Sequence, residues 1–129
     1  MNKIDTELYN ENFYAKSLRK DRQRSYNRIA SYIMNCLNPK SAVDYGCSTG
    51  MQLLHLKKLG VTDLLGIEPG DDIWDFVDPE IKDNIIKGNL IEEITLDREY
   101  DIALNIEVIE YRIIKIAPFL HQVTYILKT

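Results

Sequence analysis

The stretch from residue 42 to residue 50, Ala-Val-Asp-Tyr-Gly-Cys-Ser-Thr-Gly, constrains the fold more than any other part of this chain. Its first four residues suit a short buried strand. Gly46 and Gly50 then allow a tight turn, because glycine adopts positive φ without steric cost. A helix is expected directly after the turn, ending at Gly60. A strand that turns this tightly into a helix leaves room for a ligand beside its backbone, so the pattern predicts a nucleotide-type binding loop.

Strands and helices alternate along the rest of the chain. Strands are expected over 41–45, 63–67, 84–87, 100–105 and 122–127, and helices over 13–37, 50–59, 71–77 and 107–116. This alternation predicts an α/β fold with a mostly parallel sheet of about five strands and helices on both faces. Ligands of such sheets bind at the carboxyl ends of the strands, where the strand order reverses.

Polar residues stand at the carboxyl ends of four expected strands. They are Asp44 with the glycine turn, Glu68, Asn89 after Gly88, and Asn105. The Glu68 carboxylate can accept hydrogen bonds from both hydroxyls of a ribose. Asn89 offers a donor and an acceptor to an adenine edge, and Leu90 can cover the face of the base. Each residue alone is as well explained by a turn or a surface position, but their order on four strand ends favours nucleoside binding.

The glycine spacing separates two kinds of nucleotide ligand. A dinucleotide fingerprint requires Gly-x-Gly-x-x-Gly. Here Ser48 occupies the middle position and Gly50 comes one residue early. A pyrophosphate cradle therefore fits poorly, and a nicotinamide-dependent oxidoreductase is the weakest of the functions considered.

The pattern resembles the class I S-adenosylmethionine-dependent methyltransferases. Residues 43–50 are similar to their first motif, 65–69 to the second, 87–90 to the third, and 100–111 to the fourth. The resemblance implies a Rossmann-like three-layer α/β/α sandwich that binds S-adenosyl-L-methionine and releases S-adenosyl-L-homocysteine. The cofactor-binding residues it implies are Asp44, Tyr45, Gly46, Cys47, Ser48, Gly50, Glu68, Pro69, Asn89, Leu90 and Asn105.

The chain departs from the family pattern at three positions and in length. Ser48 replaces a glycine, Asn89 replaces an aspartate, and Tyr111 stands where many small-molecule members carry histidine. The family's last two strands are expected to be missing. The fifth strand would then be an exposed edge, which we expect a second copy of the chain or a partner chain to cover. A fragment of a longer protein is the other interpretation.

Methyl transfer from a sulfonium is an in-line displacement, so the protein mainly supplies position. A base is needed only if the acceptor loses a proton. Glu110 and Tyr111, after the fourth strand, are the catalytic candidates. The leading hypothesis is methyl transfer to a small-molecule acceptor. The alternatives are a truncated module, or a subunit, that holds the cofactor without independent transfer.

Composition limits the partners and the compartment. The net charge of −4 argues against general attraction to nucleic acid, and the basic cluster of Arg19, Lys20, Arg22, Arg24 and Arg28 fits a solvated helix face or a surface for an anionic acceptor. No apolar run reaches membrane-span length. The two cysteines predict neither a disulfide framework nor a metal site, so a cytoplasmic location is expected.

We expect residues 1–38 to form a helical segment that closes over the cofactor or packs on the sheet, and 39–129 to form the core.

Overall fold

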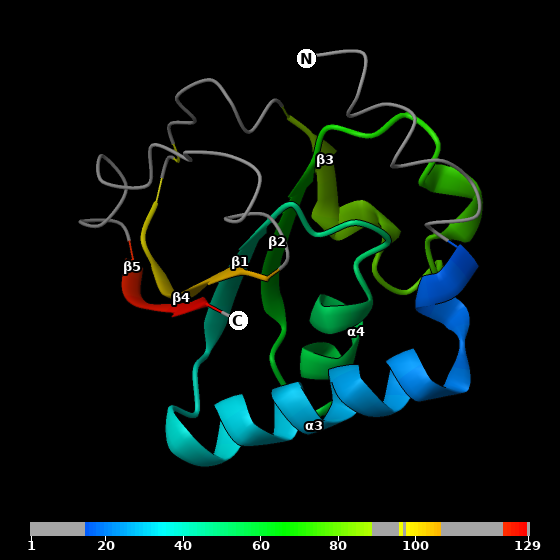
Figure 1. Ribbon diagram of the computed structural model, residues 1–129. Coiled ribbons are helices and arrows are strands. Elements are labelled where there is room, and N and C mark those ends of the chain that lie inside the picture. Colours follow the sequence, from blue (N-terminus) through cyan, green and yellow to red (C-terminus); the bar gives the residue numbers. More distant parts are fainter. Residues whose placement is uncertain (1–14, 89–95, 97, 107–122, 129) are drawn as a thin grey trace.

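A five-stranded sheet forms the centre of the molecule (Figure 1). The computed structural model describes residues 15–88, 96, 98–106 and 123–128. Its strands are β1 (Ser41–Tyr45), β2 (Asp63–Glu68), β3 (Ile85–Lys87), β4 (Tyr100–Asn105) and β5 (Val123–Lys128). Their order is β3-β2-β1-β4-β5, and all four pairings are parallel. The predicted Rossmann-like α/β fold is therefore confirmed.

The strand β1 lies at the centre of the sheet and is buried along its whole length. A strand that is covered on both faces needs apolar residues on both, which explains Ala42 and Val43 as neighbours. The chain continues from β1 to one side of the sheet through β2 and β3, and to the other side through β4 and β5. The strand order thus reverses beside β1, which places its carboxyl end, at Tyr45, at the expected ligand position.

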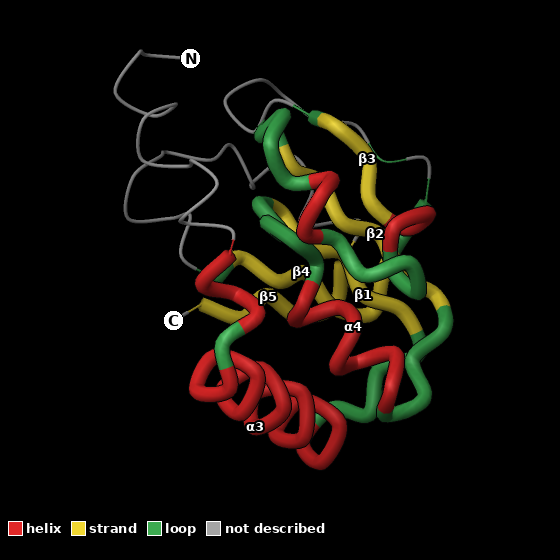
Figure 2. Tube along the Cα trace, turned by 90° about the vertical axis from the view of Figure 1, so that its right-hand side faces the viewer, coloured by secondary structure: helices red, strands yellow, loops and turns green. Residues whose placement is uncertain are grey.

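Two α-helices cover one face of the sheet (Figures 1 and 2). They are α3 (Lys20–Cys36) and α4 (Met51–Lys58), and they pack against each other. Helix α4 is buried from Met51 to Leu56, because it lies between the sheet and α3. Only Ala30 and Ile33 of α3 are buried, so this helix is the outer layer on that face. Together they form the larger core cluster with Ala42, Leu64, Ile102 and Leu104.

A second cluster of buried apolar residues is separate from the larger core cluster. It comprises Val43, Tyr45, Ile67, Leu96, Tyr100 and Ala103. The alternation of Ala42 and Val43 between the two clusters follows from the period of two in a strand. The helix expected over 107–116, which belongs to the second layer of the predicted sandwich, lies outside the described residues.

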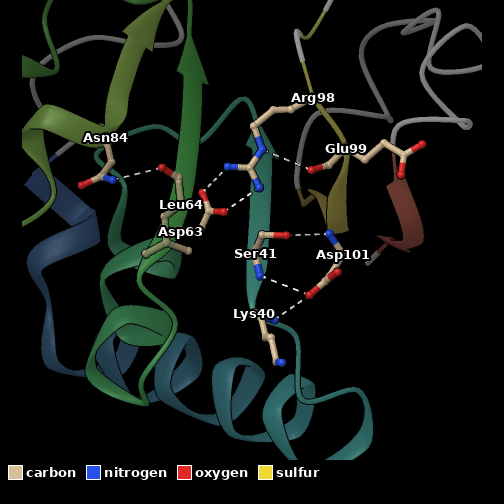
Figure 3. Close-up of polar contacts among 8 residues, drawn as sticks. All are labelled: Lys40, Ser41, Asp63, Leu64, Asn84, Arg98, Glu99 and Asp101. Carbon is tan, nitrogen blue, oxygen red and sulfur yellow. Dashed lines mark hydrogen bonds and ion pairs between the residues drawn. The ribbon is translucent and has the colours of Figure 1, made fainter.

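Hydrogen bonds fasten the amino ends of the strands to one another (Figure 3). The Asp101 carboxylate accepts hydrogen bonds from the backbone N–H groups of Lys40 at 2.7 Å and Ser41 at 3.3 Å, while the backbone N–H of Asp101 donates to the Ser41 hydroxyl at 2.8 Å. Arg98 binds the Asp63 carboxylate at 2.5 and 2.8 Å. These contacts join β1, β2 and β4 at the end opposite the glycine turn.

Several expected elements differ from the structure. The helix expected without interruption over 13–37 is broken, since Arg19 is extended (φ −65°, ψ 147°) between the 3₁₀ turn η1 (Lys16–Leu18) and α3. The helix expected over 71–77 is only a 3₁₀ turn, η2 (Trp74–Phe76), after which Val77 is extended. Strand β3 begins one residue late, because Asn84 ends a third 3₁₀ turn, η3 (Lys82–Asn84), and its side chain donates to the carbonyl of Leu64 at 3.0 Å.

Candidate functional site

The glycine-rich loop between β1 and α4 has three residues in left-handed backbone conformation. The φ angles of Gly46, Ser48 and Gly50 are 76°, 54° and 76°. Ser48 is one of two described non-glycine residues with positive φ, in the position where the related motif carries glycine. The loop turns back on β2, because the N–H groups of Gly46 and Cys47 both donate to the carbonyl of Ile67, at 2.8 and 3.2 Å. The predicted tight turn is therefore present.

The Glu68 side chain holds the middle of this loop. Its Oε2 atom accepts a hydrogen bond from the backbone N–H of Ser48 at 3.1 Å. Glu68 is only 6% exposed, although it is the last residue of β2. The contact stabilises the left-handed backbone of Ser48 and brings the carboxylate of the second strand end beside the loop of the first.

Glycines at two positions let neighbouring side chains pack closely around the loop. A Cβ atom on Gly50 would lie 2.6 Å from Cδ1 of Ile85, in addition to the strain of its positive φ. A Cβ atom on Gly66 would lie 2.6 Å from Sγ of Cys47. The Cys47 side chain thus packs against β2, beneath the backbone of the loop. A substitution at Gly50 or Gly66 would displace the loop.

The site carries buried negative charge. Asp44 and Glu68 are 4% and 6% exposed. Burial raises the pKa of the Cys47 thiol well above its usual value, and the charges of Asp44 and Glu68 raise it further. Cys47 is therefore a neutral thiol that packs in the core. Two buried carboxylates beside the loop favour a ligand with cationic groups or hydroxyl donors.

Asn105 contributes a buried amide at the carboxyl end of β4. It is 1% exposed, and within the described ranges neither its amide nitrogen nor its amide oxygen has a hydrogen-bond partner. A buried amide without partners costs free energy, which a polar ligand would recover. Asn105 therefore fits the polar role that its position suggested.

The structure brings together the cofactor candidates that it describes. Asp44, Tyr45 and the loop residues 46–50 continue from β1 and face the carboxyl end of β2 with Glu68 and Pro69. Tyr45 is 2% exposed, and its burial, together with Tyr100, raises its pKa to about 12. This places Tyr45 in the core beside the site. The candidates Asn89, Leu90, Glu110 and Tyr111 lie outside the described residues.

Sequence reasoning missed a polar network that reaches the loop from the amino-terminal segment. Thr49, omitted from the expected site, is 1% exposed, and its hydroxyl lies 2.7 Å from the Ser17 hydroxyl. His55 is 8% exposed and lies 2.8 Å from Gln23. No sequence signal links residues 17 and 49, because they become neighbours only where η1 lies against the glycine-rich loop.

Two features are absent from residues 15–88, 96, 98–106 and 123–128. In this part of the chain no helix has the length and apolar character that crossing a membrane requires. Nor do any three or more His, Cys, Asp or Glu side chains there form a group that could hold a metal ion.

Several solved structures share this arrangement. The chain matches the plantazolicin methyltransferase BpumL, in complex with a monoazolic desmethylPZN analog and SAH, at 20% identity and TM-score 0.65, over 96% of this chain and 53% of that one. It matches Streptomyces venezuelae DesVI at 20% identity and TM-score 0.56, over 81% and 43% of the two chains. It also matches the magnesium protoporphyrin IX methyltransferase ChlM from Synechocystis PCC 6803, with bound SAH, at 15% identity and TM-score 0.57, over 82% and 58%.

The likeness concerns three-dimensional structure and about half the length of each of these proteins. No protein-family profile and no curated protein matches the sequence. The match of the backbone, at TM-scores of 0.56 to 0.65, nevertheless covers 81–96% of this chain. The chain has the Rossmann-like fold of the class I S-adenosylmethionine-dependent methyltransferases.

Proposed function

We propose that this chain binds S-adenosyl-L-methionine at the carboxyl ends of its strands and transfers the methyl group to a small-molecule acceptor, leaving S-adenosyl-L-homocysteine. The observation that carries the proposal is the buried Glu68 carboxylate, held 3.1 Å from the backbone N–H of Ser48 in a left-handed glycine-rich loop. The fold and the SAH bound to BpumL and ChlM support it.

The residues present fit this cofactor chemically. S-adenosylmethionine has a cationic sulfonium and ammonium, which the buried carboxylates of Asp44 and Glu68 favour. NAD has an anionic pyrophosphate, and the glycine spacing of the loop, with Ser48 in the middle position, fits that group poorly. In our proposal Glu68 accepts hydrogen bonds from the ribose hydroxyls. The loop at 46–50 leaves room for the methionine moiety of the cofactor, and Asn105 binds a polar group of the cofactor.

The remaining roles in the proposal follow the sequence motifs. Asn89 and Leu90 bind the edge and face of the adenine. The bound cofactor supplies an activated methyl group, so the protein's task is to position the acceptor and exclude water. Glu110 and Tyr111 are proposed to contact the acceptor, with Glu110 taking a proton where the acceptor must lose one.

One observation favours a second candidate, a cofactor-binding module or subunit without independent transfer. β5 is the edge of the described sheet, next to β4 alone. An edge strand presents unpaired backbone groups to another chain. We therefore propose that a second copy, or a partner chain, pairs with β5 and completes the acceptor side.

Cytoplasm is the proposed compartment, because Cys36 and Cys47 are both free thiols.

Calorimetry tests the cofactor proposal. The expected result is saturable binding of S-adenosylmethionine and S-adenosylhomocysteine, with no binding of NAD at the same concentrations. Binding of NAD alone would replace the proposal with an oxidoreductase. Transfer of a tritium-labelled methyl group to small-molecule acceptors then separates the enzyme from the binding module, because the module binds the cofactor without transferring label.

A further inference from the structure

The glycine-rich loop is anchored from two directions. From the sheet, the Ile67 carbonyl and the Glu68 carboxylate accept the N–H groups of Gly46, Cys47 and Ser48. From the amino-terminal segment, the Ser17 hydroxyl contacts the Thr49 hydroxyl at 2.7 Å. Thr49 lies between the two left-handed residues Ser48 and Gly50. A shift of Thr49 therefore changes the loop at the positions that need their backbone conformation most.

Gln23 ties Ser17 to helix α4. Its side-chain nitrogen donates to the backbone carbonyl of Ser17 at 2.6 Å, and its side-chain oxygen lies 2.8 Å from Nε2 of His55. The Ser17 carbonyl can only accept, so the amide nitrogen of Gln23 faces it and the amide oxygen faces His55. Nε2 of His55 must then carry the proton. Burial, with a smaller contribution from Lys58, lowers the pKa of His55, which favours the neutral ring that this contact accommodates.

Two contacts extend this network along α3. The rings of Tyr26 and His55 are stacked, with centroids 6.1 Å apart and an interplanar angle of 27°. The amide nitrogen of Gln52 donates to the backbone carbonyl of Tyr26 at 3.0 Å. Both partners on α4, Gln52 and His55, belong to the helix that begins directly after the loop. The network therefore joins the amino-terminal segment to the loop and to the helix behind it.

The segment is attached differently at its two ends. The second half of α3 is anchored in the core by Ala30 and Ile33, both 0% exposed. Tyr26 and Ile29 pack, half-buried, against the core. From residue 15 to residue 25 only Ser17 is buried, so the described contacts that dock residues 16–23 are the polar ones just given. Polar contacts contribute less to stability than a buried apolar face of similar size, and regions held in this way open most readily.

We propose that docking of the segment 16–23 on Thr49 and His55 is energetically coupled to cofactor binding, with Ser17 and Thr49 as positioning residues for the glycine-rich loop. The inference rests on the proposed function, since the loop is the proposed cofactor site. Coupling between two sites is reciprocal. Docking of the segment tightens cofactor binding, and the bound cofactor must stabilise docking by the same factor.

Calorimetry with S-adenosylhomocysteine tests the first direction in Ser17→Ala, Thr49→Val and the double variant. Each single change is expected to weaken binding about 3- to 10-fold, as expected for loss of one buried hydrogen bond. The double variant should be no weaker than the poorer single variant, because both lose the same contact. Ser25→Ala is the matched control. Its hydroxyl bonds to the backbone carbonyl of Asp21 on the exposed surface of α3, so binding should stay within about 2-fold of wild type.

Hydrogen exchange tests the other direction without any variant. Backbone amides of 16–23 should exchange more slowly in the wild-type protein when S-adenosylhomocysteine is added. The inference is overturned if Ser17→Ala binds as wild type does, or if exchange in this segment does not respond to the ligand. Failure of the wild-type protein to bind the ligand overturns the proposed function as well, so the two failures are distinguishable.

Discussion

The backbone N–H of Ser48 lies 3.1 Å from Oε2 of Glu68, so the carboxyl ends of β1 and β2 are joined by a charged hydrogen bond. The same carboxylate that would bind a ribose therefore also holds the loop beside it. Parallel strands in register, with Tyr45 beside Ile67, place both groups.

Glu68→Gln should weaken binding of S-adenosylhomocysteine about 10- to 100-fold, because hydrogen bonds to a charged acceptor contribute about 1.5–3 kcal/mol. The glutamine oxygen can still accept from Ser48, so the melting temperature should change little. Calorimetry and thermal unfolding measure the two effects. Glu80→Gln, at an exposed position, is the control. Equal affinity in the Glu68 and Glu80 variants would remove Glu68 from the ribose role.

Gly66→Ala should destabilise the protein by about 1–3 kcal/mol, because the new Cβ would lie 2.6 Å from Sγ of Cys47 and 2.9 Å from Cδ1 of Leu53. Urea unfolding measures this change. Adding Cys47→Ala to Gly66→Ala should recover part of the loss, since it removes the nearer atom. A double variant less stable than the sum of the two single changes would show that the clash is not the cause.

Alkylation should distinguish the two cysteines. Cys36 is exposed, whereas Cys47 is 6% exposed and its thiol pKa is raised by burial and by nearby carboxylates. Since the thiolate is the reactive form, Cys47 should react about 100-fold more slowly than Cys36 in the folded protein and at a similar rate in denaturant. Mass spectrometry of iodoacetamide-treated protein measures both rates. Equal rates in the folded state would mean that the loop does not cover Cys47.

The Tyr45 hydroxyl should make stability depend on alkaline pH. Its pKa rises from 10.0 to about 12 on folding, because the side chain is buried. Below pH 10 the hydroxyl is protonated in both states and has no effect. Between pH 10 and about 12 the unfolded state ionises while the folded state does not, so the free energy of unfolding falls. Tyr45→Phe should reduce this fall, and Tyr32→Phe, at an exposed position, should not. Parallel curves for wild type and Tyr45→Phe would contradict the assignment.

Asp101→Ala should lower the free energy of unfolding by about 1–3 kcal/mol, because the backbone N–H groups of Lys40 and Ser41 lose their shared acceptor. Glu99→Ala is the control, since Figure 3 shows the Glu99 side chain pointing away from these contacts. Chemical denaturation compares the two variants. Cofactor affinity should be preserved in both, because the contacts of Asp101 with Lys40 and Ser41 lie at the opposite end of the strands from the glycine-rich loop.

The sequence by itself determined the elements whose signals are local. The strand at 41–45, the turn at Gly46 and Gly50, and the strand at 100–105 were predicted with the observed bounds, because buried strands and left-handed glycines have specific residue requirements. The motif order also placed Glu68 and Asn105 at strand ends. Periodicity was less reliable at Arg19 and over 71–77, where single turns replaced expected helix.

Only the tertiary structure decided which distant residues meet. The contact of Ser17 with Thr49 spans 32 positions and that of Ser41 with Asp101 spans 60, and neither has a signature in the chain. The burial of His55 likewise depends on α3 crossing α4. Local sequence patterns report backbone preference and the side of an element that is apolar. Long-range polar contacts instead depend on how the elements pack, which no short stretch of residues encodes.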